Sequence, residues 1–247
     1  MSFYAEIHKP DAVADDDLRR QFGALKKAGK ARYLGLVCHS SVPAVVKAAV
    51  GVGWYDVILS TYNFASRDDL KPMVPAAKAK DIGLLTMKSS RALPRGADFV
   101  GACKRFLADG IDAVLRTIQT AKELEDYLRL ATKGDKTPAL QAAEVPIGGQ
   151  CTLCGACAPC PQGVAIQDVL RTFQYYAQDL GDVEEAFRQY AGIPLDSLPP
   201  ACSDCGRCEA ACPQDLPVRQ LLCTAHRELE LELVRHRASG PGTRRGS

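Results

Sequence analysis

The sequence predicts an α/β protein in two parts: a series of βα units, followed by a small helical domain that contains most of the cysteines. Short apolar segments alternate with amphipathic ones over residues 1–133, and nine of the 11 cysteines lie between Cys151 and Cys223. The 247 residues suffice for one or two domains at about 150 residues each. A composition of 47% hydrophobic and 24% charged residues excludes a fibrous or disordered chain.

Five βα units are predicted within residues 1–133. The first strand (3–7) precedes helix 15–28, where Leu18, Phe22 and Leu25 recur at helical spacing before Gly29 ends the helix. The other strands are predicted over residues 31–37, 56–61, 82–87 and 113–118, and the other helices over 42–50, 68–80, 97–109 and 121–131. Apolar strands alternating with such helices indicate a parallel sheet covered by helices. A doubly wound sheet and a section of a (β/α)8 barrel both fit this spacing.

The second part is predicted to begin after a linker. Residues 134–150 are rich in polar residues, proline and glycine, as linkers are. The domain that follows, residues 151–235, has helical patterns over 166–177, 183–190 and 217–234. Residues 236–247 show no apolar periodicity and are predicted to be a disordered tail.

Charge and hydropathy exclude several classes of partner. The net charge of +2 is too small for a protein whose main partner is nucleic acid. The longest run without Asp, Glu, Lys or Arg is 145–167, and its glycines, prolines and cysteines do not suit a membrane span. The first residues lack the pattern of a signal peptide. We therefore expect a cytoplasmic protein with no membrane or nucleic-acid partner.

Eight cysteines form two motifs of similar spacing. The first is C-x2-C-x2-C-x2-C-P, and the second is C-x2-C-x2-C-x3-C-P, the run typical of bacterial ferredoxins. In two-cluster ferredoxins the fourth thiolate of such a run ligates the other cluster. We therefore predict two [4Fe–4S] clusters with crossed ligands. One set is Cys151, Cys154, Cys157 and Cys212, and the other is Cys202, Cys205, Cys208 and Cys160.

Zinc and disulfides are the alternatives for these cysteines. Zinc also binds four thiolates, but its ligands usually come in two pairs and do not require a third cysteine at the same spacing. Disulfides need an oxidising compartment, for which the sequence carries no signal. The remaining cysteines, Cys38, Cys103 and Cys223, are predicted to be small buried hydrophobic residues.

The connection between the two motifs, residues 161–201, has a helical pattern and is longer than in compact ferredoxins. It resembles the alpha-helical ferredoxin domains of multidomain oxidoreductases.

Short segments of the first part are similar to the aldo/keto reductase family. Ile7-His8-Lys9-Pro10 resembles its fourth-strand motif, and residues 29–36 resemble the following helix-to-strand turn. Tyr62-Asn63 and Met87-Lys88 are similar to the ends of the sixth and seventh strands, and residues 120–128 to the helix after the eighth. With both cysteine motifs, the sequence resembles the subgroup that carries a C-terminal two-[4Fe–4S] ferredoxin domain, truncated at its N-terminus.

The resemblance implies a partial (β/α)8 barrel of about five βα units and NADPH-dependent reduction of a small carbonyl substrate. Of the family's Asp, Tyr, Lys and His tetrad, only the His maps onto this sequence, at His8, which would position the carbonyl. Asn63 would contact the cofactor, and Lys88 and Arg116 would reach its phosphates. Val37 replaces a Ser that usually holds the nicotinamide amide, and its apolar side chain cannot make that hydrogen bond.

Two functions fit these observations. The first is an iron–sulfur oxidoreductase of this subgroup, which exchanges single electrons with a partner protein. The second is a non-catalytic electron-transfer or docking protein with a barrel remnant. Carbonyl reduction by this chain alone is not expected, because general acid catalysis needs a positioned proton donor and no residue fills the role of the Tyr. A partial barrel would also leave two sheet edges to be covered by a partner or a second copy.

Overall fold

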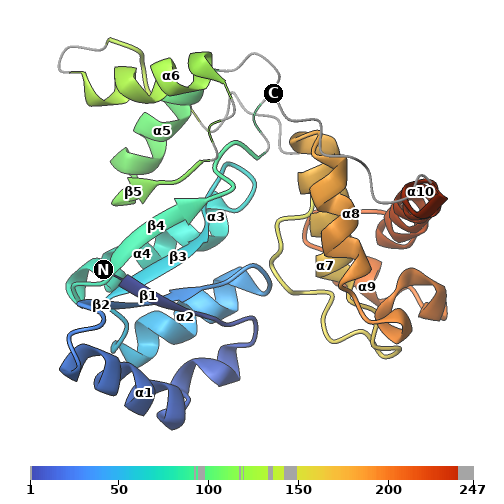
Figure 1. The fold of residues 1–247 in the computed structure, drawn as a ribbon, viewed down its shortest axis with the longest axis horizontal. Helices are drawn as coiled ribbons and strands as arrows, with labels where there is room; N and C mark the ends of the chain where they lie inside the picture. The colour runs from blue at the N-terminus through green and yellow to red at the C-terminus, as the bar shows by residue number, and fades with distance from the viewer. Residues whose placement is uncertain are drawn as a thin grey trace. The chain divides into compact units, whose positions relative to one another are not determined.

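A computed structural model describes residues 2–91, 93, 98–116, 118, 120–132, 136–141 and 149–238. The chain divides into two compact units (Figure 1). The first unit comprises Met1–Gly148 and Thr152–Gly155, and the second comprises Gly149–Cys151 and Ala156–Ser247. Residues 152–155, in the middle of the first cysteine motif, therefore belong to the α/β unit rather than to the helical one.

Five parallel strands form a single sheet in the first unit, so the predicted α/β class with a parallel sheet is confirmed. The strands are β1 (Ser2–Glu6), β2 (Tyr33–Val37), β3 (Val57–Thr61), β4 (Gly83–Met87) and β5 (Ala113–Val114), and they lie side by side in that order. A doubly wound sheet has a point where the strand order reverses. The described strands have no such reversal, so the doubly wound alternative is wrong for them.

Helices follow each strand of this sheet. They are η1 (Pro10–Ala14), α1 (Asp16–Lys27), α2 (Val42–Val52), α3 (Arg67–Leu70), η2 (Lys71–Met73), α4 (Val74–Ala79), α5 (Phe99–Ala108) and α6 (Ala121–Ala131). Side-chain caps fix several of their starts: Asp15 accepts from Leu18 N at 2.8 Å, and Thr120 forms a capping box with Glu123. Right-handed crossovers that all run in one direction place their helices on the same face of the sheet, and the sequential strand order fits this arrangement for the described helices.

The buried face of the sheet follows the alternation of side chains along each strand. Leu36, Ile58 and Leu84 lie in register across β2, β3 and β4, and all three are buried. Helix α2 packs on this sheet with its buried face of Val42, Val45, Val46, Ala49 and Val50. Val37 and Leu59, which are in register with each other on the opposite face, are only half-buried.

Three expected elements of the first unit differ in the structure. The single helix expected over 68–80 is wrong: it is divided into α3, η2 and α4 because Pro72 and Pro75 lack the N–H that would continue the helical ladder. Among the described residues, the strand expected over 113–118 is shortened to Ala113–Val114, although Leu115 N still donates to Thr86 O at 2.7 Å. Residues 136–141 of the expected linker pack along α5, where Leu140 N donates to Gly101 O at 2.9 Å. Residues 142–148 lie outside the described residues.

The second unit is built from helices. They are α7 (Ile166–Leu170), η4 (Arg171–Asp179, a π-helical continuation), α8 (Val183–Ala191), η5 (Leu195–Ser197), η6 (Pro199–Ala201), α9 (Arg207–Ala210) and α10 (Val218–Ala238). Helix α10 contacts α7 and α8 through a buried stripe that includes Leu222, Ala225 and Leu229. A hydrogen bond between the Tyr190 hydroxyl and His226 Nδ1 also connects α10 to α8.

Helix α10 extends beyond residue 234, where the sequence predicts its end. The helix runs on to Ala238 because its first glycine after residue 234 is Gly240, so 236–238 are helical rather than part of a disordered tail. Residues 239–247, the rest of that tail, are not among the described residues. Within the described ranges, no helix is both long and apolar enough to cross a membrane.

Candidate functional site

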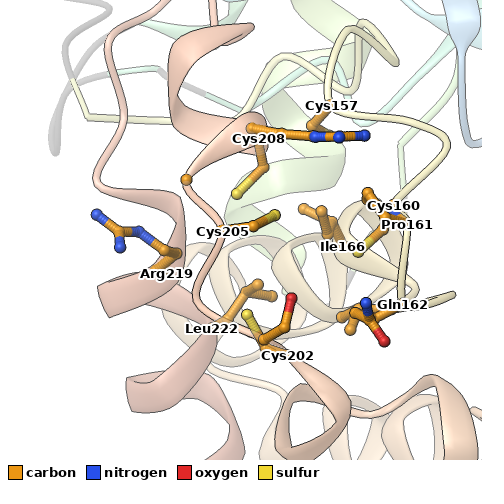
Figure 2. A pocket seen from close by; sticks show the side chains of 14 residues that line it. Cys157, Cys160, Pro161, Gln162, Ile166, Cys202, Cys205, Cys208, Arg219 and Leu222 are labelled. Carbon is orange, nitrogen blue, oxygen red and sulfur yellow. The ribbon is translucent and has the colours of Figure 1, made fainter.

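Five cysteine side chains line one cavity in the second unit (Figure 2). Cys157 and Cys160 come from the loop before α7, Cys202 and Cys205 from the loop after η6, and Cys208 from α9. The lining also includes the apolar residues Pro161, Val164, Ile166 and Leu222 and the polar residues Gln162, Ser203, Arg207 and Arg219. The cavity therefore combines several soft sulfur donors with a partly apolar lining.

The loop from Cys202 to Cys208 curls because two of its residues have left-handed backbone. Asp204 has a φ of +57° and Gly206 a φ of +73°, and Gly206 is also the N-cap of α9. This curl lets Asp204 N donate a hydrogen bond to Cys202 Sγ at 3.4 Å. A backbone N–H aimed at a cysteine sulfur stabilises negative charge on it, as outer-shell donors do around iron–sulfur clusters.

The thiols at this cavity are chemically suited to bind iron. None of the 11 cysteines is in a disulfide bond in this structure. Burial raises the pKa of the Cys208 thiol, and a hydrogen bond from a backbone N–H offsets part of this rise. Among the described residues, no three His, Cys, Asp or Glu side chains already lie in metal-holding geometry. The donor set nevertheless fits a [4Fe–4S] cluster, which takes four thiolates.

The structure brings together one of the two predicted ligand sets. Cys202, Cys205, Cys208 and Cys160 all line the cavity, and Cys157 from the other set lines it too. Cys151 is buried in the second unit, and Cys212 follows α9 without lining the cavity. Cys154 lies in the segment that belongs to the first unit.

The cysteines outside both motifs differ in burial. Cys38 and Cys103 are fully buried, and burial raises the pKa of each thiol to about 12, so both stay protonated and act as small apolar groups. Cys223 is exposed, so the prediction of burial is wrong for it. Its neighbour Leu222 points inward, and successive residues of a helix face different directions.

Arg219 clamps the ligand loop to the first turn of α10. Its guanidinium donates to Asp204 Oδ1 at 2.8 Å and to Glu209 Oε2 at 2.9 Å, and its backbone N–H donates to Glu209 Oε1 at 3.0 Å. Hydrogen bonds from Arg219 lower the pKa of Glu209, and those two carboxylates raise the pKa of Arg219. In Figure 2 the guanidinium points away from the sulfurs. One arginine thus fixes the loop on both sides of Cys205 and Cys208.

Replacing this arginine with Gln is expected to speed iron loss from the reconstituted protein by about tenfold, because outer-shell partners fix the orientation of the ligands. The measurement is the bleaching of visible absorbance after addition of EDTA. Arg188→Gln is the matched control, since Arg188 is exposed and pairs with Glu185 on α8. Equal bleaching rates in the two variants would show that the clamp is irrelevant to the cluster.

Residues 152–155 are held against the start of α2. Val42 N donates to Leu153 O at 3.2 Å, and the Leu153 side chain is buried. Gly155 has a φ of +88°, and a Cβ added there would lie 2.8 Å from Ser41 Oγ and 3.1 Å from Ser41 Cα. Only glycine allows this close approach, so the α/β unit itself fixes the backbone next to Cys154.

Gly155→Ala is expected to displace this segment, because overpacking a close contact costs about 1–3 kcal/mol. The readout is amide hydrogen exchange at Val42, which loses its protection when Leu153 O moves away. Gly163→Ala is the control: its φ is +73°, but an added Cβ meets nothing within 4 Å. Unchanged protection of Val42 in Gly155→Ala would contradict the predicted contact.

The other predicted site residues lie in the first unit. Lys88 is buried at the end of β4, and its Nζ lies 2.8 Å from His39 Nδ1. His8 is half-exposed beyond β1, with Nε2 3.1 Å from Glu6 Oε1. His39 and Glu6 are missing from the sequence-based candidates. The sequence feature that could have identified them is their position at the carboxyl ends of two predicted strands, where parallel sheets bind their ligands.

Asn63 and Arg116 have structural partners in this unit. Asn63 Oδ1 accepts from Ala65 N at 3.0 Å and from Ser66 N at 3.1 Å, while its Nδ2 donates to Lys88 O at 3.1 Å. Arg116 is paired with Glu123, and its guanidinium lies 4.3 Å from the centre of the Phe99 ring. In this structure both side chains stabilise the unit itself.

Comparison with known proteins identifies only the cysteine-rich part. Residues 150–217 match the family model of a 4Fe-4S dicluster domain, and this span includes both cysteine motifs. Neither the curated proteins nor the solved structures contain a match. Residues 150–217 are therefore similar to iron–sulfur dicluster proteins and form a ferredoxin-like iron–sulfur domain.

Proposed function

We propose that the protein transfers single electrons through two [4Fe–4S] clusters held by crossed ligand sets. The observation that carries this proposal is the cavity itself. Cys160 of the first motif lines it together with Cys202, Cys205 and Cys208 of the second. Crossed ligation requires that juxtaposition, because the fourth cysteine of each run serves the other cluster. The remaining set would be Cys151, Cys154, Cys157 and Cys212.

The chain's own side chains prepare the site for this task. When bound, a [4Fe–4S] cluster accepts and releases one electron. Ile166 and Leu222 give the cavity a buried apolar side, and Asp204 N stabilises negative charge on Cys202. Arg219 holds the loop and adds a positive charge, offset by Asp204 and Glu209. The loop is therefore shaped by the polypeptide and needs less ordering when iron binds.

The exposure of Cys205 supports exchange of electrons with a partner protein. Cys205 is the exposed cysteine of the cavity, whereas Cys208 is buried. An electron-transfer partner that docks over Cys205 would come close to the cluster without opening the unit. The partner is expected to be another redox protein, since weak contacts of small area suit transient electron exchange.

A second candidate function is NADPH-dependent carbonyl reduction, as the resemblance to aldo/keto reductases implies. The sequential order of the five strands supports it, because the strands of a barrel also neighbour each other in chain order. His8 and Lys88 follow the carboxyl ends of β1 and β4, where barrel enzymes place their catalytic groups. His8 would orient a carbonyl. The proton donor of such a reaction is not identified among the chain's residues.

Anaerobic reconstitution tests the two functions in turn. About eight irons per chain are expected for two clusters, with reversible one-electron reduction by dithionite. Zinc in place of iron would contradict the first proposal. NADPH is then titrated into the reconstituted protein. Saturable NADPH binding would support the reductase candidate. Full iron content without NADPH binding would contradict the reductase candidate and leave electron transfer as the remaining function.

A further inference from the structure

The π-helical segment η4 carries a buried glutamine that binds the backbone at Cys151. Gln174 lies in the middle of η4, and 4% of the residue is exposed. Its Oε1 accepts from Cys151 N at 2.9 Å, and its Nε2 donates to Gly149 O at 3.1 Å. All of these residues belong to the second unit. One side-chain amide therefore holds the backbone at the start of the first cysteine motif.

The π-helical backbone helps to direct this side chain. Its wider hydrogen bonds continue to the end of the segment, where Leu180 N donates to Tyr175 O at 3.0 Å, five residues earlier. Each π-helical turn contains more residues than an α-helical turn, so its side chains point in directions that a continuous α-helix would not give them. Such departures from α-helical geometry are frequent at functional sites. The orientation of Gln174 thus depends on a local feature of this kind.

The two cysteine motifs use a backbone N–H in different ways. In the second motif Asp204 N donates to Cys202 Sγ at 3.4 Å, whereas in the first motif Cys151 N donates to the amide oxygen of Gln174. A hydrogen bond to a sulfur stabilises the additional negative charge of a reduced cluster and so raises its reduction potential. By accepting the bond from Cys151 N, Gln174 withdraws this N–H from the sulfurs of a cluster bound there.

Burial of the cysteines acts in the same direction. Each predicted ligand set contains one buried cysteine, Cys151 in one set and Cys208 in the other, but the second set also contains the exposed Cys205. Water stabilises the charge of the reduced form, and solvent exposure is one of the factors that set the potential of a cluster. The surroundings of Cys205 therefore favour reduction more than those of Cys151.

We propose that Gln174 is a positioning residue that lowers the reduction potential of the cluster ligated by Cys151, so that this cluster is harder to reduce than the one ligated by Cys205. The inference rests on the proposed function. It gives electron transfer a direction: one electron passes from the Cys151 cluster, which is oxidised, to the Cys205 cluster, which is reduced, and no bond forms or breaks. The electron then leaves for the partner protein at the exposed cysteine.

A redox titration of the whole reconstituted chain, followed by electron paramagnetic resonance, tests the order of the two clusters. Two one-electron steps are expected, with dithionite as the reductant. Cys154→Ser should abolish the step at lower potential, and Cys205→Ser the step at higher potential. Cys154 shares a motif with Cys151, and the two remain in one ligand set whether or not the fourth ligands are crossed. The assignment is therefore independent of crossed ligation.

Gln174→Leu tests the glutamine itself. Leucine has a similar size but offers no acceptor to Cys151 N, so the lower potential should rise by about 59 mV, which is a tenfold change in the equilibrium constant for one electron. Gln174→Glu retains an acceptor for this N–H and should not raise the potential. Gln189→Leu is the matched control, because Gln189 donates to Glu185 Oε1 at 2.8 Å within α8. This variant should leave both potentials unaltered.

Three results would overturn the inference: loss of the lower step in Cys205→Ser, coincidence of the two steps in the unaltered protein, or a lower potential that rises no more in Gln174→Leu than in Gln189→Leu. Faster iron loss from Gln174→Leu at an unchanged potential would likewise reduce Gln174 to a structural role. If Gln174→Leu binds no iron, the order of the steps in the two cysteine variants decides. Zinc in place of iron in the unaltered protein would instead refute the proposed function, and metal analysis distinguishes this result from the others.

Discussion

Cys160→Ser is expected to reduce the iron content of the reconstituted protein by about half, from eight to four per chain. Cys160 belongs to the first motif by sequence but lines the cavity with three cysteines of the second. Serine keeps the size of the side chain and replaces the soft thiolate, which iron–sulfur clusters require, with a hard hydroxyl. Iron and acid-labile sulfide are the quantities to measure.

Cys223→Ser provides the control for this loss. Cys223 is exposed on α10 and lies outside both motifs, so its replacement should leave the full iron content. Full iron in Cys160→Ser would show that Cys160 is not a ligand. Equal loss in both variants would instead indicate a general sensitivity of the protein to cysteine substitution.

Asp109→Asn is expected to destabilise the α/β unit by about 3 kcal/mol, because it removes the buried counter-charge of Arg67 and leaves that arginine paired with the exposed Asp68. The side chains of Asp109 and Arg67 are 3% and 11% exposed. Arg67 Nη2 donates to Asp109 Oδ1 at 2.9 Å, and the Tyr62 hydroxyl donates to Oδ2 at 3.0 Å. Trp54 is the only tryptophan, so its fluorescence during urea unfolding reports on this unit.

The same carboxylate gives this unit a pH dependence. Burial raises the pKa of Asp109, but hydrogen bonds from Arg67, Tyr62 and Lys71 outweigh it and lower the pKa below its ordinary value. Its contribution to stability is therefore complete above the unfolded pKa of about 3.9 and is lost as the pH falls through the lower, folded pKa.

Asp112→Asn is the control for the Asp109 variant. Asp112 pairs with Lys78 at an exposed position, and such pairs contribute about 0.2–1 kcal/mol. A loss of stability in Asp109→Asn no larger than in Asp112→Asn would contradict a role for the buried pair.

Periodicity predicts the elements of this fold well where a single physical rule decides them. Apolar strands and amphipathic helices mark all five βα units, and the start of α6 follows from the capping box at Thr120. The rule fails where local chemistry overrides the pattern. Prolines divide the helix expected over 68–80, and backbone hydrogen bonds to α5 pack part of the expected linker. Strand order is a tertiary property that spacing does not encode.

The iron–sulfur domain at residues 150–217 is predictable from its two cysteine motifs, because cluster binding imposes a spacing on the chain. The contact between Arg219 and the ligand loop is not predictable from the sequence. Arg219 is distant in sequence from Asp204, and the two side chains meet only when α10 folds back on the loop. The same holds for the carboxyl edge of the sheet. His8 and Lys88 are found by resemblance, whereas Glu6 and His39 are revealed only by their distances in space.

Two double variants test crossed ligation most directly. Cys160→Ser with Cys202→Ser removes two ligands of one predicted cluster, so about four irons should remain. Cys160→Ser with Cys154→Ser removes one ligand from each, so little or no iron should remain. The opposite pattern, with iron retained in the second double variant and lost in the first, would show that each motif holds its own cluster and would contradict the account.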